Sequence, residues 1–429
     1  MYPHRRKLFH PRLTDLPRGC SSYPHSSRLL MNSYGEVAAF AHFGYGYGAS
    51  PLFTPCTSSL EPSTQLTPLT SMYHRMQSVV FDNEGRFIIS MTDGCITIHN
   101  FYKLSQQAKD YNPKPGEFDV IDNTDPFHIA YGTPTIPTGT PPVAIMWRNT
   151  TNQFAFSTTT TLSLYDVNRF EIADFCSGVD TFEDIASSSD GSLIAAGGDT
   201  VILWDPRQGK QPMYELKHHN ITSIQFDKSD QNIFFVDGSR NRNIYRWDIR
   251  ASSMDAALPQ HIRALELPET TPQGVVIGRF IRSIRFNPDC SFQLAFVTGY
   301  GVAGVFDTDI LQMTHCHSLY RDKRYHYGKP SWLHACSVFA LPINENIRLL
   351  DFHHSPKSPS HVDYIVNAAS QRHIYRDVRC SQKITTCSAH PSYNVIAAGN
   401  MRNALEIVSQ RKLKPEEEEK EEEEEEEEK

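Results

Sequence analysis

The chain has 429 residues, enough for one large domain or several, and its formal net charge is −8. Residues 416–429 hold twelve Glu and two Lys, a charge of −10, so the remaining chain carries about +2. No apolar run reaches the ~18–20 residues that a membrane helix needs, and no apolar signal core follows the basic residues 1–7. The nine cysteines lack the spacing of a disulfide framework. We therefore expect a protein of the nucleus or cytoplasm with reduced thiols and no membrane contact.

Residues 1–75 are rich in Pro, Ser, Thr and Tyr and predict a mostly irregular N-terminal extension. Within this extension, residues 27–32 favour a short helix that contains Leu29 and Leu30.

A short unit then recurs over residues 76–410. It has an apolar stretch, a Gly/Ser/Asn turn, a second apolar stretch and, in its two clearest copies, a closing Trp-Asp. Those copies end in Trp204-Asp205 and Trp247-Asp248, so the two tryptophans are 43 positions apart. The seven copies predict strands at 78–81, 87–89 and 96–99; 143–147, 154–157 and 162–166; 183–186, 193–196 and 201–205; 221–226, 233–236 and 244–247; 283–286, 294–297 and 303–307; 349–352, 364–367 and 373–377; 384–389, 395–398 and 404–408.

A period of roughly 40–45 residues with alternating apolar strands is typical of β-propeller blades. One such unit cannot bury its faces alone, and radial closure of the units leaves only short edges exposed. The sequence therefore predicts an all-β, seven-bladed β-propeller over residues 76–410. The Glu-rich residues 411–429 predict a disordered acidic tail, because like charges repel one another.

Two long insertions, 104–141 and 309–347, interrupt the repeats. We place both between the outer strand of one blade and the inner strand of the next, which makes that face of the ring a predicted binding surface. Residues 320–327 interleave aromatic and basic side chains, a pattern that suits single-stranded nucleic acid as well as an ordinary polar loop. The nearly neutral charge of the repeat region argues against nucleic acid.

Signals for catalysis are absent from the sequence. It contains no Gly-x-Ser-x-Gly elbow, no phosphate-binding Gly-x4-Gly-Lys and no Cys-x2-Cys pair. His315-Cys316-His317 would place two ligands on one face of a strand, but a second pair at metal-site spacing is missing. We interpret this triplet as an outer strand, and we expect no enzyme activity, no cofactor and no metal.

The recurring unit resembles the repeat of the WD40 family over about residues 76–410, most closely over 181–250. In that family a Trp, a His before the blade and a turn Asp form a buried hydrogen-bonded network. The resemblance gives Trp204 and Trp247 structural roles and places His219, 28 residues before Trp247, in the position of the His. Asn241 stands where the family has the turn Asp.

An Arg follows the Asp of three repeats, in Asp205-x-Arg207, Asp248-x-Arg250 and Asp377-x-Arg379, and we place each Arg just past a third strand. Trp-Asp-x-Arg resembles the box of WD40 substrate receptors of cullin-4 ubiquitin ligases, in which the Arg contacts the propeller adaptor of the ligase. By resemblance, Arg207 and Arg250 take that role, while Arg379 lacks the Trp. Such receptors also dock through a short N-terminal helix, which would give Leu29 and Leu30 a part in binding.

The same arginines would also suit simple pairing with acidic neighbours, without a ligase. Our first hypothesis is a non-catalytic scaffold that acts as substrate-recognition subunit of a cullin-4 RING ubiquitin ligase and binds a protein substrate. The alternative is a structural scaffold subunit of a nuclear chromatin or RNA-processing complex. In that case the Glu-rich tail binds histones or other basic proteins, or it only aids solubility.

Overall fold

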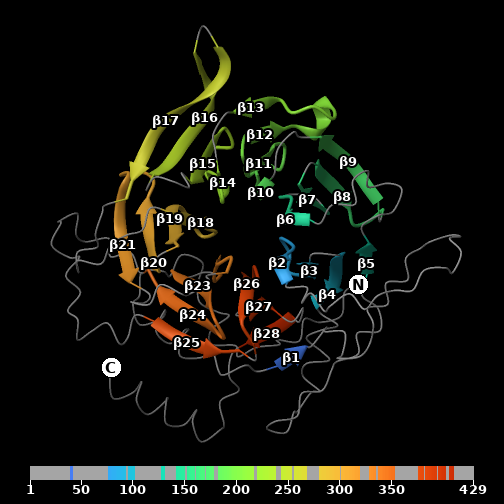
Figure 1. Ribbon diagram of the computed structural model, residues 1–429, viewed down its shortest axis with the longest axis vertical. Coiled ribbons are helices and arrows are strands. Elements are labelled where there is room, and N and C mark those ends of the chain that lie inside the picture. Colours follow the sequence, from blue (N-terminus) through green and yellow to red (C-terminus); the bar gives the residue numbers. More distant parts are fainter. Residues whose placement is uncertain are drawn as a thin grey trace, which may run out of the picture.

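The ring of strands is the dominant feature of the computed structural model (Figure 1). The structure describes residues 39–41, 76–92, 95–101, 127–130, 142–149, 152–159, 161–169, 171–177, 182–216, 220–237, 243–253, 256–267, 280–299, 301–318, 328–334, 337–352, 375–380, 382–393, 395–401 and 405–409. Its strands form seven four-stranded antiparallel sheets arranged around a central axis. The predicted all-β, seven-bladed β-propeller is confirmed.

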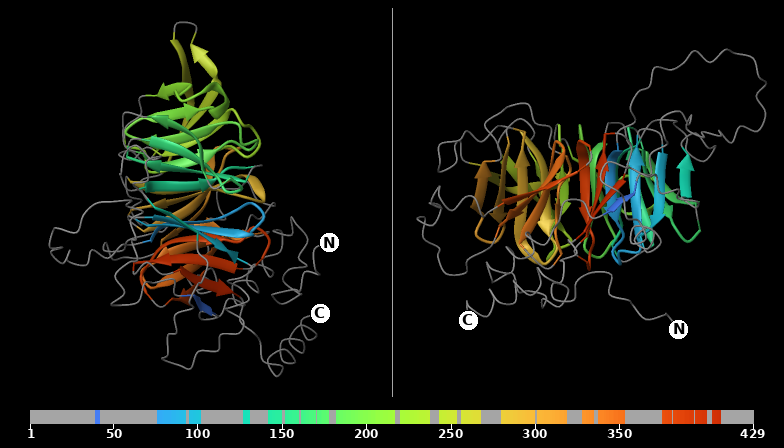
Figure 2. Two further views of the ribbon diagram at one scale, coloured as in Figure 1. Left: turned by 90° about the vertical axis from the view of Figure 1, so that its right-hand side faces the viewer. Right: turned by 90° about the horizontal axis from the view of Figure 1, so that it is seen from below.

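The first four blades follow the chain from the innermost strand outward. They consist of β2 (Met76–Phe81), β3 (Phe87–Thr92), β4 (Cys95–Asn100) and β5 (Phe127–Ala130); β6 (Pro142–Trp147), β7 (Gln153–Thr158), β8 (Thr161–Asp166) and β9 (Glu171–Ser177); β10 (Phe182–Ser187), β11 (Ile194–Gly198), β12 (Val201–Trp204) and β13 (Tyr214–Leu216); β14 (Ile224–Phe226), β15 (Ile233–Asp237), β16 (Asn243–Ser253) and β17 (Ala256–Glu266). The 11-residue strands β16 and β17 make a hairpin that projects beyond the ring (Figure 2).

The remaining blades complete the circle. They consist of β18 (Ile281–Asn287), β19 (Cys290–Thr298), β20 (Val302–Asp307) and β21 (Gln312–Ser318); β22 (Ser331–Trp332), β23 (Val338–Ile343), β24 (Asn346–Asp351) and β25 (Tyr375–Arg379); β26 (Ile384–Ala389), β27 (Val395–Asn400), β28 (Leu405–Ser409) and β1 (Ala39–Ala41).

The core lies between neighbouring blades. Middle strands such as β20 and β23 are buried at every position, because each blade packs on both of its faces. Trp204 is fully buried in an apolar cluster shared by blades two and three. Trp247 stacks on Phe234, with ring centroids 6.1 Å apart, between blades three and four. Stacking of blades therefore supplies the burial that one blade cannot achieve alone.

The two ends of the described chain meet in blade seven. β1 pairs with β28, so a strand from the predicted N-terminal extension supplies the fourth strand of the last blade. Side-chain contacts also join blades seven and one: Phe81 N donates to Ser388 Oγ at 3.2 Å, and His390 Nε2 lies 3.0 Å from Gly85 O. The ring is thus closed both by backbone pairing and by packing of its first and last blades.

Our assignment of blade six is wrong in its register. Residues 349–352 were expected as an inner strand, but they lie at the end of the third strand, β24, and just after it. The inner strands β22 and β23 lie inside 309–347, which we expected to be an insertion between blades. The continuous apolar run of β23 lacks alternation, and Pro342 within it argues against a central strand, so the pattern was missed.

The prediction that both insertions lie between the outer strand of one blade and the inner strand of the next holds for only part of each insertion. Because the strands of a blade are antiparallel, the links between first and second strands and between third and fourth strands lie on one face, which we call face A. Of the first insertion, residues 104–126 belong to the link from β4 to β5, which is a face A link, and much of the second insertion consists of β21, β22 and β23. Residues 131–141 and 319–330 join successive blades and belong to the opposite face.

Candidate functional site

Arg207 lies on face A directly after the third strand of blade three. Its backbone belongs to the short 3-10 helix η2 (Pro206–Gln208), which Asp205 caps. Arg207 Nε donates to Asp205 Oδ1 at 2.9 Å, and Arg207 Nη2 donates to Asp205 Oδ2 at 2.7 Å. The carboxylate is buried, whereas the Arg207 side chain is 69% exposed. A bidentate pair of this kind fixes the plane of the guanidinium while leaving it open to solvent.

Arg250 repeats this geometry in the neighbouring blade. Its Nε donates to Asp248 Oδ1 at 2.9 Å and its Nη2 donates to Asp248 Oδ2 at 2.8 Å. Nη2 also donates to Asp230 Oδ2 at 2.7 Å, which ties β16 to the link between β14 and β15. Arg250 lies within β16 and not just past the third strand as we expected, because β16 continues to Ser253. The Arg250 side chain is 55% exposed. We call Asp205, Arg207, Asp230, Asp248 and Arg250 the fork edge.

The charges of the fork edge hold one another ionised. Hydrogen bonds from Arg207 lower the pKa of Asp205, and hydrogen bonds from Arg250 lower the pKa of Asp248. Asp248 in turn raises the pKa of Arg250 above its ordinary value. Both forks therefore remain charged across the physiological pH range and present two oriented cations on adjacent blades.

The third Asp-x-Arg does not form such a fork. It lies on β25, the outer strand of blade six, and not after a third strand as we expected. Asp377 is directly opposite Arg348 and accepts two hydrogen bonds from it, at 2.7 and 2.6 Å. Because Asp377 is bound to the buried Arg348, it does not orient Arg379, whose side chain is exposed.

The other predicted site residues divide into two groups. Leu29, Leu30, His219 and Asn241 lie outside the described residues. Trp204 is buried as expected, but its Nε1 donates to Gly209 O at 2.7 Å, within the turn of its own blade. Trp247 is buried too, at 8% exposure. The tryptophans therefore have packing roles.

His315, Cys316 and His317 lie on β21, the outer strand of blade five, as predicted. The rings of His315 and His317 both pack on Phe352, at centroid distances of 6.3 and 5.1 Å. Burial raises the pKa of Cys316 to about 12 and lowers that of His317 to about 4. Over the described ranges, no group of three His, Cys, Asp or Glu side chains is placed to hold a metal ion.

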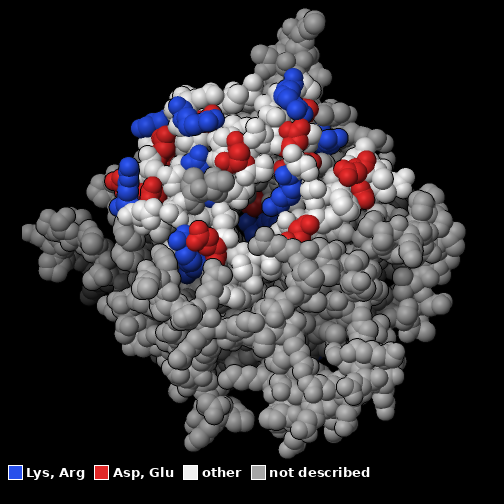
Figure 3. All heavy atoms as spheres, turned by 180° about the vertical axis from the view of Figure 1, so that it is seen from behind, with Lys and Arg blue, Asp and Glu red and all other residues white. Residues whose placement is uncertain are grey.

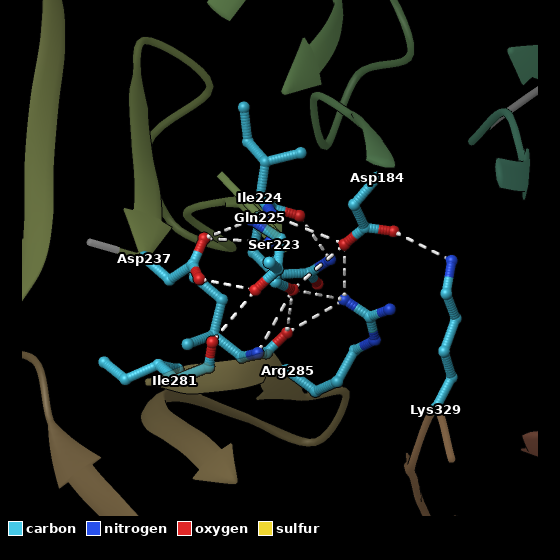
Figure 4. A network of polar contacts seen from close by, with 10 residues as sticks. Asp184, Ser223, Ile224, Gln225, Asp237, Ile281, Arg285 and Lys329 are labelled. Atoms are coloured by element: carbon cyan, nitrogen blue, oxygen red, sulfur yellow. Dashed lines mark hydrogen bonds and ion pairs between the residues drawn. The ribbon is translucent and has the colours of Figure 1, made fainter. Parts of the chain in front are cut away.

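Sequence reasoning missed a polar network on the innermost strands (Figure 4). Asp184 of blade three accepts hydrogen bonds from Ser223 Oγ and Arg285 Nη1, each at 3.0 Å, and lies 3.6 Å from Lys329 Nζ. These residues come from four successive blades and surround the central axis. Consecutive members of this network are 39 to 62 positions apart in the chain, so no local sequence motif could predict it.

No helix in the described part of the chain is both long and apolar enough to cross a membrane. Cys176, Cys290, Cys316, Cys380 and Cys387 are free thiols. No protein-family model matches the chain, and no curated protein matches it. The seven-bladed β-propeller is an architecture that suits a protein-interaction scaffold.

Proposed function

We propose that the protein is a non-catalytic substrate-recognition subunit of a cullin-4 RING ubiquitin ligase, acting in the nucleus or cytoplasm. In this proposal the fork edge binds the propeller adaptor of the ligase. The observation that carries it is the pair of oriented, half-exposed guanidinium groups of Arg207 and Arg250 on the same face of adjacent blades. The resemblance of both segments to the Trp-Asp-x-Arg box gives this pair its suggested partner.

The geometry suits a protein interface. Arg207 and Arg250 each use Nε and Nη2 for their aspartates, and Nη1 has no hydrogen-bond acceptor among the described residues. Each guanidinium can therefore donate to a backbone carbonyl or carboxylate of a partner without giving up its own Asp. Preorganised arginines lose little freedom on binding, which is one reason why Arg is enriched among interface hot spots.

The test is a double variant, Arg207→Ala/Arg250→Ala, compared with the native chain for recovery of the cullin-4 adaptor by affinity purification. Hot-spot truncations cost about 2–4 kcal/mol, so we expect recovery to fall by at least tenfold. Arg282→Ala is the matched control, because Arg282 is also exposed but lies near the start of β18, away from face A. Thermal unfolding of both variants checks that the ring is intact.

Recovery of the adaptor at the native level by the double variant would contradict the proposal. Purification of a chromatin or RNA-processing complex without cullin-4 would favour the alternative scaffold. In that case, deletion of residues 415–429 should weaken a salt-sensitive interaction, because the Glu-rich segment would bind basic partners.

A further inference from the structure

A central cavity of about 370 Å³ lies between the innermost strands. Part of its wall comes from links on face A, including Lys228, Pro288, His334 and Pro391. Figure 3 shows a hollow in the middle of one face, with basic side chains on its wall. The lining includes two lysines, one arginine and a single carboxylate, together with two histidines: Lys228, Lys329, Arg285, Asp184, His334 and His390. Burial lowers the pKa of both lysines, and the neighbouring carboxylates of Asp289 and Asp184 oppose that shift.

The one carboxylate of the lining is already occupied. Asp184 Oδ2 accepts from Ser223 Oγ, from Ile224 N and from Arg285 Nη1 at 3.0–3.2 Å. Burial alone would raise the pKa of Asp184, but the charges of Arg285 and Lys329 and these hydrogen bonds outweigh burial and lower it. One ionised carboxylate is therefore shared between two cations, and the wall keeps an excess of positive charge.

Acidic groups behind the wall compensate only part of this excess. Asp289 lies 3.8 Å from the ring of His334 and acts on Lys228 from a distance. Asp237 is bound to Thr222 and Ser223, and burial raises its pKa to about 7. A carboxyl with that pKa is only partly ionised at neutral pH.

Several donors on the wall are unused. Lys329 Nζ is buried and has no hydrogen-bond partner among the described residues; its nearest carboxylate oxygen, Asp184 Oδ1, is at 3.6 Å. Thr386 Oγ1 is likewise buried without a partner there. Arg285 makes its three hydrogen bonds through Nη1, and Figure 4 shows its other amino group pointing away from those acceptors. A buried polar group without a hydrogen-bond partner destabilises the folded protein, so we expect these donors to bind an acceptor.

We propose that the central cavity binds a small anion of the phosphate class, either orthophosphate or the phosphoryl group of a small phosphomonoester. Arg285 and Lys329 would hold its oxygens, with Thr386 as a neutral donor and Lys228 as a further positive charge. A phosphate dianion has several acceptor oxygens, so it matches the guanidinium of Arg285 and the ammonium of Lys329 better than a single carboxylate does. The cavity is at the small end of ligand sites, which suits a phosphate but not a folded partner.

The test is a calorimetric titration of the full chain with orthophosphate at constant ionic strength, together with thermal unfolding at each concentration. We expect saturable binding with a stoichiometry of one, and an unfolding midpoint that rises with phosphate. Glycerol 2-phosphate in place of orthophosphate decides whether the site also accepts an ester. Acetate should bind at least tenfold more weakly, and equal binding of acetate would overturn the assignment to phosphate.

Lys329→Met keeps the stem of the side chain and removes the charge. We expect it to weaken phosphate binding at least tenfold, and Lys228→Met/Lys329→Met to abolish it. Without phosphate, Lys329→Met should unfold at the native temperature or above, because Arg285 still neutralises Asp184 and the removed ammonium made no hydrogen bond among the described residues. Lys210→Met is the matched control, since Lys210 is exposed and lies over the ring of Phe175, outside the cavity.

A purely structural lysine gives a different result. If Lys329 served only as counter-charge of Asp184, Lys329→Met would lower the unfolding temperature, and phosphate would have no saturable effect on the native chain. Either that result or equal phosphate binding by native chain and double variant would overturn the proposal.

Discussion

Gly85 and His390 join the first and last blades at a contact that leaves no room for a larger side chain. Gly85 adopts φ = +70°, and a Cβ atom there would lie 2.0 Å from His390 Nε2. His390 Nδ1 accepts from the backbone N–H groups of Ser392 and Tyr393, each at 3.0 Å. Since Nδ1 is an acceptor, the proton of the neutral ring is on Nε2, which donates to Gly85 O. This hydrogen-bond pattern requires a neutral imidazole.

We predict an acid-dependent loss of stability at this contact. Burial lowers the pKa of His390 to about 4 in the folded protein, below the ordinary value of 6.5. The folded state therefore binds fewer protons than the unfolded state between pH 6.5 and pH 4. The contribution of His390 to stability is complete above pH 6.5 and is lost as the pH falls through that window.

The measurement is the urea-derived free energy of unfolding at pH 7 and pH 4.5. In His390→Gln, whose amide can still donate to Gly85 O, the difference between the two values should shrink by roughly 2 kcal/mol. His317, whose pKa burial also lowers to about 4, should account for a further part of the acid effect. If the difference between the free energies of unfolding at pH 7 and pH 4.5 is the same in His390→Gln as in the native chain, protonation of His390 does not destabilise the folded protein.

Side-chain pairs could be anticipated from the sequence only where the two partners are close together in the chain. Arg207 pairs with Asp205 and Arg250 with Asp248, and in both cases the partners are two residues apart in the chain, so the arginine side chain can reach back to the carboxylate. The same spacing at Asp377 and Arg379 led to a wrong placement. There Asp377 pairs with Arg348, a residue on the neighbouring strand that the local sequence does not reveal.

At the scale of elements, the closing strand β1 determines how blade seven ends. It has three residues, and Ala39 pairs with Ile407 and Ala41 with Leu405. Without it, β28 would have an unpaired edge, which invites association with other chains. So short a strand has no periodicity of its own, and its partner is more than 360 positions away. The sequence pattern therefore could not predict it, whereas the strands of blade three follow plainly from their apolar stretches and the closing Trp-Asp.

Truncation tests the role of β1. A chain that begins at residue 46 lacks β1, whereas a chain that begins at residue 36 keeps it. Loss of a few ladder hydrogen bonds at about 0.5–1.5 kcal/mol each should lower the free energy of unfolding by about 2–4 kcal/mol. Light scattering should also detect association of the shorter chain. Equal unfolding midpoints of the two truncated chains would contradict a stabilising role for β1.

At the scale of the whole molecule, Asp184 links blades three, four, five and six through Ser223, Arg285 and Lys329. The number of blades was predictable from the apolar stretches and their spacing, although the strands of blade six were assigned in the wrong register. The residues that face the axis were not predictable, because each inner strand contributes only one or two polar side chains to a shared site. Only the closed ring brings them together.

Asp184→Asn should destabilise the whole ring. The amide can still accept hydrogen bonds from Ser223 and Ile224, but it leaves two cations without a counter-charge. Breaking a buried ion pair costs about 3–5 kcal/mol, and the partial exposure of Arg285 and Lys329 reduces this to about 2–3 kcal/mol. Urea unfolding measures the loss. Asp184→Asn/Lys329→Met should regain part of it, and a double variant less stable than Asp184→Asn would show that the charges are not coupled.

The closure of the ring by β1 also sets the order of events during synthesis on the ribosome. β1 leaves the exit tunnel first, yet its partner β28 ends at Ser409. At about 5–20 residues per second, roughly 20–70 seconds separate the emergence of the two strands. During that interval the nascent chain holds β1 without its partner, and the last blade can be completed only once nearly the whole chain has been translated. We therefore expect closure to be a late step of folding, open to chaperones and to premature pairing between neighbouring nascent chains.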